Sequence, residues 1–493
     1  MNILLVYPRY PETFWSFRYA LSFISKKASH PPLGLLTVAA LLPSEWNKRL
    51  VDLNISNLTD EDLAWANYVF IGGMSIQRAS AQEVIARCRN AGKPIVAGGP
   101  LFTALHEELD TVDHLVLNEA EITLPPFLHD LAQGRPKQYY ASQEFADITR
   151  TPIPLWNLLR KKPYASMNLQ YSRGCPYDCD FCDITVLYGH RPRTKTTPQV
   201  LAELDSLYNW GWRGNVFFVD DNFIGNKRKL KNEILPAVIR WTEQRNRPFT
   251  LNTEASINLS DDEELMQLMV RAGFDAVFVG IESPNDESLL ECHKLHNRNR
   301  DLMASVRRIH ATGLEVQAGF ILGFDKDPAS IFDSLIRFVQ ESGIVTAMVG
   351  LLNAPKNSKL YHRMIKEGRL LKNMSGDNTD ASLNFVPTMN LDKLMEGYHH
   401  VLRSIYTPKH YYARAKKFLK EFKPAYKAIG TIRTAHIRAL LKSMVLLGVI
   451  GKERVQYWKL FFWSLLFKPR VFPLAITFAI YGFHYRKVFE QSL

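Results

Sequence analysis

Cysteine is scarce in this sequence, with five among 493 residues. Five thiols are too few for the disulfide framework of a secreted protein, so we expect a reducing, cytosolic compartment. The first residues read as an apolar strand and lack the basic segment and cleavage site of a signal peptide. We therefore expect no export.

A hydrophobic run long enough to cross a bilayer is also missing. The two densest apolar blocks, residues 457–467 and 471–483, are shorter than the run of about 20 that a spanning helix needs. Acidic residues are rare in the same region: from His399 to Leu493 there are 3 Asp and Glu against 18 Lys and Arg, whereas the rest of the chain has 46 against 43. We expect residues 362–493 to form a helical, basic C-terminal region. Its apolar faces either pack on the protein or lie on an anionic membrane surface, and no recognised module supports nucleic-acid binding.

Three of the five cysteines lie within eight residues, as Cys175, Cys179 and Cys182 in a C-x3-C-x2-C spacing. Three thiolates can hold three corners of a [4Fe-4S] cluster and leave the fourth iron open to a small molecule. The alternative is a zinc site with His190 as fourth ligand, although this spacing is not a usual zinc motif. Cys88 and Cys292 are far from the triplet in sequence. We expect Cys88 to be a small core residue and Cys292 to lie on a helix surface or in the core.

Short apolar segments alternate with helical patterns over residues 1–135. The expected strands are residues 3–7, 49–52, 68–71, 94–97 and 114–117, and the clearest helices are 33–42 and 79–90. Continuous apolar strands of this length are typical of a parallel sheet covered on both faces, so we predict a doubly wound α/β domain. Residues 136–164 have little periodicity and several prolines, which indicates a linker.

The alternation resumes over residues 165–361, at spacings that suit a partial (βα)6 barrel. The expected strands are residues 167–171, 216–219, 249–252, 276–279, 315–321 and 347–350. The cysteine run follows the first of them. Functional loops of parallel barrels come from the carboxyl ends of the strands, so polar residues at those ends are site candidates.

The cysteine triplet, with Phe181 just before its last member, resembles the signature of the radical S-adenosylmethionine (SAM) enzymes. In that family the open iron chelates SAM, an electron from the cluster cleaves it, and the resulting 5'-deoxyadenosyl radical removes a substrate hydrogen. The resemblance implies that Phe181 lies against the adenine. It also implies SAM contacts by residues at successive strand ends, namely Asp220, Asp221 and Asn222 for the amino group, Glu254, Ser256 and Glu282 for SAM or its ribose, and Gly319 and Gly323 along the adenine. Capping of the next helix is the alternative role for the acidic ones.

The N-terminal domain resembles part of the cobalamin-binding fold. The likeness is carried by Ser75 after the third strand and by Gly98 and Gly99 after the fourth. Glycines let the backbone approach the corrinoid tail, although a glycine pair after a strand also suits a tight turn. The D-x-H-x2-G motif that supplies a cobalt ligand is absent. His30 is in roughly the topological place of that ligand and is otherwise a loop histidine before a helix.

The whole chain resembles cobalamin-binding radical SAM proteins of the class B C-methyltransferase type, most closely over residues 1–360. The subgroup it resembles includes the hopanoid 2-methylase. The resemblance implies a [4Fe-4S] cluster, SAM and cobalamin as cofactors, methylation at an unactivated carbon of an apolar lipid, and a flavodoxin or ferredoxin as electron donor. The alternatives are a non-methylating reaction, such as oxidative cyclisation of a tetrapyrrole, and a zinc-bearing protein that docks on a membrane or nucleic acid.

Overall fold

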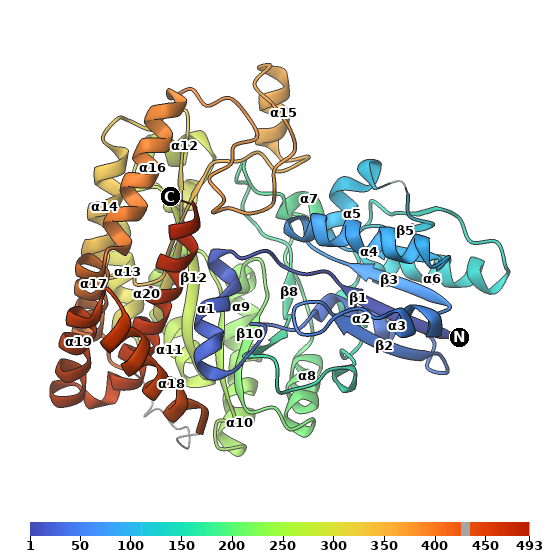
Figure 1. Cartoon of the computed structure of the whole chain (residues 1–493), viewed down its shortest axis with the longest axis horizontal. Helices are drawn as coiled ribbons and strands as arrows, with labels where there is room; N and C mark the ends of the chain where they lie inside the picture. Colours follow the sequence, from blue (N-terminus) through green and yellow to red (C-terminus); the bar gives the residue numbers. More distant parts are fainter. Residues whose placement is uncertain (110, 425–433, 493) are drawn as a thin grey trace.

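The structure, a computed structural model, describes residues 1–109, 111–424 and 434–492. Two lobes lie side by side, each built on a sheet of six parallel strands. Figure 1 shows the N-terminal lobe in blue on the right and the larger lobe, green to red, on the left. The predicted α/β class, with a doubly wound domain, a partial barrel and a helical C-terminal region, is confirmed.

The N-terminal sheet has the strand order β2-β1-β3-β4-β5-β6. Alternate side chains of β1 enter different cores: Leu4 and Val6 pack on one face of the sheet, and Ile3 and Leu5 on the other. Helices cover both faces, as a parallel sheet requires. The first core includes residues of α3 (Asp60–Trp65), α4 (Arg78–Asn90) and α5 (Pro100–Leu105), and the second includes residues of α2 (Leu33–Leu41) and α6 (Ala120–Ala132).

All five predicted strands of this sheet are present. They are β1 (Asn2–Tyr7), β2 (Asn47–Asp52), β3 (Tyr68–Gly72), β4 (Ile95–Gly98) and β5 (His114–Val116). A sixth strand, β6 (Tyr139–Tyr140), pairs with β5 and lies within the segment expected to be a linker. Two residues are too few to show a periodicity, which is why sequence patterning does not reveal this strand.

The second lobe contains a curved sheet in the order β14-β13-β12-β11-β10-β7. Its strands match the six predicted for the barrel. They are β7 (Ser166–Leu169), β10 (Gly214–Phe218), β11 (Phe249–Glu254), β12 (Phe274–Glu282), β13 (Glu315–Leu322) and β14 (Ala347–Leu351). Helices α8 (Thr197–Asn209), α10 (Leu235–Gln244), α11 (Glu263–Ala272), α13 (Leu302–Ala311) and α14 (Ile331–Ser342) alternate with the strands.

The C-terminal helices complete the core beside β14. Residues of α16 (Leu391–Tyr406), α17 (Pro408–Glu421) and α20 (Phe472–Ser492) belong to the same hydrophobic cluster as the barrel strands. The Tyr406 hydroxyl donates to the carbonyl of Ala347 at 2.6 Å. Gly397 of α16 lies so close to Phe332 of α14 that an added Cβ would sit 2.2 Å from its ring. The second predicted apolar block therefore packs on the protein.

The first apolar block behaves differently. It lies in α19 (Arg454–Phe467), which buries Tyr457, Leu460 and Phe461 but leaves Phe462 and Leu466 exposed. Packing on the protein thus accounts for only one side of this helix. Among the helices that the structure describes, none combines the length and the apolar content needed to cross a bilayer.

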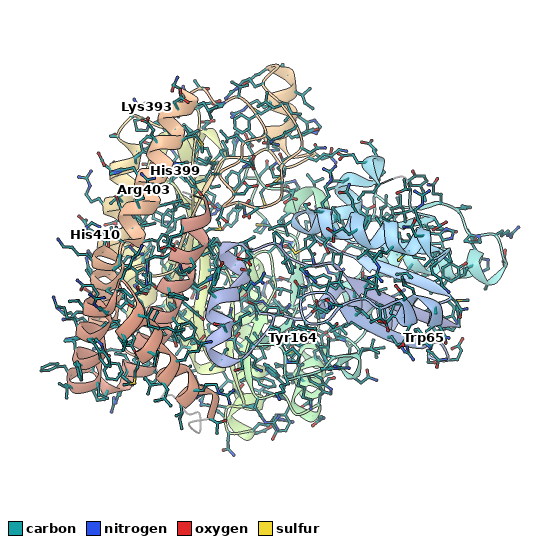
Figure 2. The ribbon with its side chains drawn as sticks, in the orientation of Figure 1. Trp65, Tyr164, Lys393, His399, Arg403 and His410 are labelled. Atoms are coloured by element: carbon teal, nitrogen blue, oxygen red, sulfur yellow. The ribbon has the colours of Figure 1, made fainter. Side chains whose placement is uncertain are left out.

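A buried hydrogen bond links the lobes near the start of the barrel. The Tyr164 hydroxyl donates to Oδ2 of Asp52, at the end of β2, at 2.9 Å. Burial raises the pKa of Tyr164, so its hydroxyl keeps the proton that it donates. Figure 2 shows Tyr164 at the junction of the two lobes, far from Trp65 on the outer side of the N-terminal lobe. Residues at the carboxyl ends of strands from both sheets line one shared space.

Candidate active site

A cavity of about 1470 Å³ lies between the lobes. On the N-terminal side its wall consists of loops that follow β1, β3 and β4, and on the other side it consists of residues at the ends of the barrel strands. Ligands of parallel α/β sheets bind beyond the carboxyl ends of their strands, and here two such edges meet. This cavity is therefore the candidate site.

The cysteine run forms the loop between β8 (Ser172–Arg173) and α7 (Ile184–Tyr188). Its entry requires glycine: Gly174 has φ +91°, and an added Cβ would lie 2.8 Å from the carbonyl oxygen of Gly189. The backbone N–H of Cys175 donates to that same carbonyl at 3.2 Å. The loop therefore begins at a fixed position next to the cavity.

The three thiols of this loop are neighbours. Each is free of disulfides and partly exposed. Burial raises the pKa of Cys179 to about 11, and the nearby Cys175 adds to that shift. Burial also raises the pKa of Cys182, which lies beside both other thiols. Within the described residues no three His, Cys, Asp or Glu side chains converge as they would on a single metal ion. Neighbouring thiols on one loop fit the donor set of a cubane cluster, which takes one thiolate for each of three irons.

The two carboxylates after β10 hold the cysteine loop in place. Asp220 is buried and accepts hydrogen bonds from the backbone N–H groups of Tyr171 and Ser172 and from the Ser172 hydroxyl. Asp221 accepts from the N–H of Gly174 at 2.8 Å. Burial raises the pKa of Asp220 to about 7 and that of Asp221 to about 6. Both also line the cavity, where the sequence predicts that they position the SAM amino group.

Asn222 and Ser256 form a network beside the first cysteine. The Asn222 amide lies 4.0 Å from the Cys175 sulfur and donates to the Ser256 hydroxyl at 3.3 Å. That hydroxyl in turn donates to Asn258, whose amide donates to the Tyr177 hydroxyl at 2.8 Å. Ser256 therefore contacts the residues that support the loop, and its predicted contact with SAM stays a prediction.

Glu254 is a third carboxylate at the ends of the barrel strands, near Asp220 and Asp221. It ends β11, lines the cavity, and has no hydrogen-bond or ion-pair partner among the residues that the structure describes. Burial and, to a smaller extent, the neighbouring Asp221 and Asp220 together raise its pKa to about 8. A cationic ligand beside it would relieve this cost, because an opposite charge favours the ionised form.

Glu282 has a partner that the sequence did not indicate. The Lys294 ammonium lies 2.7 Å from its carboxylate, and both side chains are largely buried. Although burial opposes the shift, Glu282 and the Cys179 thiol raise the pKa of Lys294. Glu282 has φ +64° at an irregularity in the pairing of β12 with β13, and it faces the cavity. This strained position brings a buried positive charge close to the cysteine loop.

The residues predicted along the adenine lie partly in the cavity wall. Phe181 and Gly319 line it, and the Lys294 ammonium lies 5.8 Å from the centre of the Phe181 ring. A side chain at Gly319 would come within 3.0 Å of Phe278. Gly323 instead forms a turn after β13, with φ +101° and its N–H donating to Asp327 at 2.8 Å.

The N-terminal wall contains the predicted corrinoid contacts. Ser75, Gly98 and Gly99 all line the cavity. Gly98 cannot carry a side chain, since an added Cβ would lie 2.5 Å from the Val116 carbonyl oxygen, and Gly99 has φ +87°. The glycine pair thus serves the strand packing and also leaves backbone uncovered at the cavity.

The two candidate histidine ligands have different surroundings. His30 lines the cavity with its ring 5.5 Å from that of Phe217, and burial lowers its pKa to about 4, so it is neutral. His190 is exposed, and its Nε2 lies 3.9 Å from Asp178. Cys88 is a buried core residue, as predicted, and Cys292, for which helix surface or core was expected, is buried in the core as well.

A buried ionic cluster at the cavity was not predicted. Arg173, directly before the cysteine loop, pairs with Glu119 and Glu121 of the N-terminal lobe, both at 2.8 Å. Arg193 pairs with Glu119, also at 2.8 Å. The paired residues are some 50 or more positions apart in sequence, so no local motif reveals the cluster. The sequence offers one signal, which is the position of Arg173 directly before the cysteine loop.

A segment before the C-terminal helices also reaches the N-terminal wall. Residues 374 and 376–379 line the cavity. Gly376 has φ +85°, and an added Cβ would lie 2.6 Å from the backbone nitrogen of Ile76. This segment therefore lies directly against the turn that contains Ser75.

Two family models match the chain. The Radical SAM superfamily matches residues 169–339, which include the cysteine loop and most of the barrel. A domain of unknown function, DUF4070, matches residues 358–493, close to the C-terminal region defined from charge and periodicity. The two matches together cover most of the larger lobe.

Two curated proteins resemble the chain over nearly their full lengths. An uncharacterized methyltransferase of Synechocystis sp. is 42% identical, covering 100% of this chain and 93% of that protein. The hopanoid C-2 methylase of Rhodopseudomonas palustris is 34% identical, covering 93% of this chain and 88% of that protein. The first alignment spans the whole chain, including the N-terminal lobe and the C-terminal helices, and the second covers most of both regions.

The fold resembles a solved structure of the same architecture. The radical SAM methyltransferase TsrM from Kitasatospora setae, solved with cobalamin and a [4Fe-4S] cluster bound, aligns with a TM-score of 0.63 over 99% of each chain at 15% identity. The cysteine loop, the two-lobed fold and the full-length relatives agree. This chain belongs to the radical SAM superfamily and, within it, to the cobalamin-binding methyltransferases of the subgroup that includes hopanoid C-2 methylase.

Proposed function

We propose that this protein transfers a methyl group to an unactivated carbon of an apolar, polycyclic lipid. The supporting observation is one cavity of about 1470 Å³ with walls from both lobes. Sites for a single drug-sized ligand occupy about 300 to 1,000 Å³, so this cavity has room for more than one ligand. A substrate, SAM and a corrinoid that share one space can exchange a methyl group without releasing it.

The residues present fit the cofactors of the family. Cys175, Cys179 and Cys182 would hold a [4Fe-4S] cluster, and the backbone around Gly98 and Gly99 would face a corrinoid. When bound, the cluster supplies the electron that cleaves SAM and the corrinoid supplies the methyl group. Ser75 would add a hydroxyl contact to the corrinoid.

The side chains of the protein position the ligands and exclude water. Asp220 and Asp221 fix the start of the cysteine loop through the hydrogen bonds described above. Ionised Glu254 would attract the cationic sulfonium and amino groups of SAM. Apolar side chains from both lobes, including Leu33, Phe217 and Met348, line the cavity and would hold a hydrocarbon. A saturated carbon has no lone pair, so one hydrogen atom must be removed before a methyl group can bond there. A site that excludes water and fixes the positions of its ligands favours these two steps in that order.

Two partners follow from this proposal. Each SAM cleavage consumes one electron, which we propose a flavodoxin or ferredoxin supplies. A polycyclic lipid resides in a bilayer, so we also propose a peripheral contact between the C-terminal region and a membrane.

The test is reconstitution of the full chain under argon with iron, sulfide and cobalamin. We expect about four irons and one corrinoid per chain. With reduced flavodoxin, SAM carrying a deuterated methyl group and a hopanoid, the product should gain that methyl group. Deoxyadenosine and S-adenosylhomocysteine should form in equal amounts.

Other products would identify the alternatives. Deoxyadenosine without S-adenosylhomocysteine or a methylated product would indicate a non-methylating reaction, such as a cyclisation. Colourless protein with one zinc per chain would show that the chain holds no iron-sulfur cluster and would contradict the whole proposal. If methyl transfer proceeds with a chemical reductant but not with flavodoxin or ferredoxin, only the assignment of the electron donor is wrong.

A further inference from the structure

Exposed apolar side chains gather on one helical hairpin of the C-terminal region. The hairpin comprises α18 (Thr434–Val445), a π-helical turn (Leu446–Ile450) and α19, and the hydroxyls of Ser443 and Tyr457 join its two arms at 2.8 Å. It holds ten of the 23 large apolar side chains that are exposed in the described part of the chain. These ten, the apolar hairpin face, are Ile437, Leu441, Val445, Val449, Ile450, Val455, Phe462, Leu465, Leu466 and Phe467.

The exposed apolar residues recur at helical spacing, so they form continuous apolar stripes along the helices. Ile437, Leu441 and Val445 recur every four positions along α18, on the side opposite the buried Ala439 and Ser443. On α19 the buried side belongs to Tyr457, Leu460 and Phe461, yet the other side is apolar as well. In a protein surrounded by water, a helix with apolar side chains on all sides is normally covered on all sides by other parts of the protein or by a partner.

The exposed charges of the hairpin itself have a single sign. Exposed cations of the hairpin and its continuation are Arg438, Lys452, Arg454, Lys459, Lys468 and Arg470. The one acidic residue between positions 434 and 470, Glu453, is buried and paired with Arg486. Within residues 434–470 the exposed charges are therefore all positive, and an apolar surface with such charges complements an anionic lipid headgroup layer.

The same charges disfavour the other occupants. A second copy of the chain, paired by a two-fold axis, would bring these cations against one another. Nucleic acid would match the charge, but bases stack on aromatic rings, and eight of the ten exposed side chains are aliphatic.

The hairpin also adjoins one edge of the cavity. The Lys442 ammonium donates to the carbonyl of Ser22 at 2.9 Å, and the Arg438 guanidinium donates to the Ser25 hydroxyl at 3.1 Å. Ser22 and Arg18 line the cavity and are exposed, so the cavity opens to the outside there. Figure 1 shows α18 at the lower edge of the molecule and α19 on the outer side, away from the N-terminal lobe.

From these observations we infer that the apolar hairpin face inserts into the surface of an anionic bilayer, with the edge of the cavity at Ser22 next to the lipid. This assignment rests on the proposed function, because it gives an apolar substrate a short path from the bilayer to the site. It deepens that proposal by naming the surface and the kind of lipid. The hairpin lies on the membrane rather than across it.

Flotation of the reconstituted full chain with vesicles tests the inference. The vesicles are phosphatidylcholine alone or a 3:1 mixture with phosphatidylglycerol. We expect binding to the mixed vesicles at low salt, at least fivefold weaker binding at about 500 mM salt, where charges are screened beyond a few ångströms, and at least fivefold weaker binding to phosphatidylcholine alone.

Matched variants distinguish insertion of the apolar hairpin face into the bilayer from non-specific adsorption of exposed apolar residues. Leu466→Asp/Phe467→Asp changes two side chains that are 68% and 72% exposed and should lower vesicle binding at least tenfold. Leu371→Asp changes a leucine that is 64% exposed but lies outside the hairpin, and it should bind within twofold of the wild type. Lys452→Glu/Lys459→Glu tests the charge without touching the apolar side chains and should weaken binding to mixed vesicles only.

Three results would overturn the inference. The wild type could fail to float with the mixed vesicles, the double aspartate variant could float like the wild type, or light scattering could show a dimer that the aspartates convert to a monomer without any vesicle binding. Flotation needs neither SAM nor substrate. Vesicle binding without methyl transfer would therefore count against the proposed methyl transfer alone. Methyl transfer to detergent-dispersed substrate without vesicle binding would count against the inference and the proposed membrane contact, and would leave the proposed reaction intact.

Discussion

The four cysteines of the barrel differ in what surrounds them. Cys175, Cys179 and Cys182 share the loop at the cavity, whereas Cys292 ends α12 (Asp286–Glu291), packs in an apolar cluster and donates to the Leu289 carbonyl at 3.6 Å. We expect alanine at any of the first three positions to abolish deoxyadenosine formation and to lower the iron content. Cys292→Ala should keep about four irons and cost only about 1 kcal/mol in unfolding free energy. Loss of iron in Cys292→Ala would show that the ligand set is wrong.

Glu254 should make stability depend on pH. Burial raises the pKa of this carboxyl to about 8, so the stability gained from its neutral form is complete below about pH 4.5 and is lost as the pH rises through about 8. Glutamine stays neutral throughout. We therefore expect Glu254→Gln without SAM to match the wild type near pH 5 and to exceed it near pH 8 by about 1 to 3 kcal/mol, measured by urea unfolding. The exposed Glu83→Gln should give no such divergence, and parallel curves for Glu254→Gln would contradict the prediction.

Sequence reasoning located the polar residues of this site better than their contacts. Asp220 and Glu254 were found because each follows a recognisable strand. Lys294 was missed because its pairing with Glu282 depends on an irregular stretch of β12, and a lone lysine after a short helix has no distinguishing pattern. The predicted contacts with SAM all stay predictions, namely those of Phe181, Asp220, Asp221, Asn222, Glu254, Ser256, Glu282, Gly319 and Gly323.

Strands and helices were predictable where periodicity spans a whole element. All eleven strands expected from the sequence are present, because most of them carry the apolar residues that a buried parallel strand favours. The two-residue β6 has too little sequence to show a pattern. The contact of Gly376 with the turn at Ile76 joins segments 300 residues apart, and only the folded chain reveals it.

The link between the lobes depends strongly on Arg173. This side chain joins β8 to the start of α6 through Glu119 and Glu121, all three largely buried. Although burial opposes the shift, Arg173 lowers the pKa of Glu121. Arg173→Met would leave two buried carboxylates with less compensation, so we expect a loss of about 3 to 5 kcal/mol in unfolding free energy. The exposed Arg150→Met, whose partner Asp147 lies 3.7 Å away, should change stability by less than about 0.5 kcal/mol. Equal effects of the two variants would show that the cluster does not stabilise the fold.

Two sheets contribute to one site, and the C-terminal region packs against the lobe that carries the second sheet. The ring of Phe14, near the N-terminus, stacks on Tyr485 of α20 at 4.2 Å between centroids. Charge counting along the sequence left open whether this region packs on the protein or lies on a membrane surface. It could not show that α16, α17 and α20 share a core with the barrel, because packing partners are not encoded in local composition.

Because the lobes face one cavity, the two cofactors should be separable by mutation. Ser75→Trp places a large ring in the N-terminal wall, 100 residues before the cysteine loop. We expect corrinoid content to fall at least fivefold while the iron content stays near four per chain, measured on protein reconstituted with both. Gly98→Trp is a poorer test, because any side chain there meets the Val116 carbonyl and disturbs the sheet. Asn90→Trp, at the exposed end of α4, is the matched control and should keep both cofactors. If Ser75→Trp retained its corrinoid, the corrinoid would have to bind away from the ends of β3 and β4, and the shared cavity would lose its explanation.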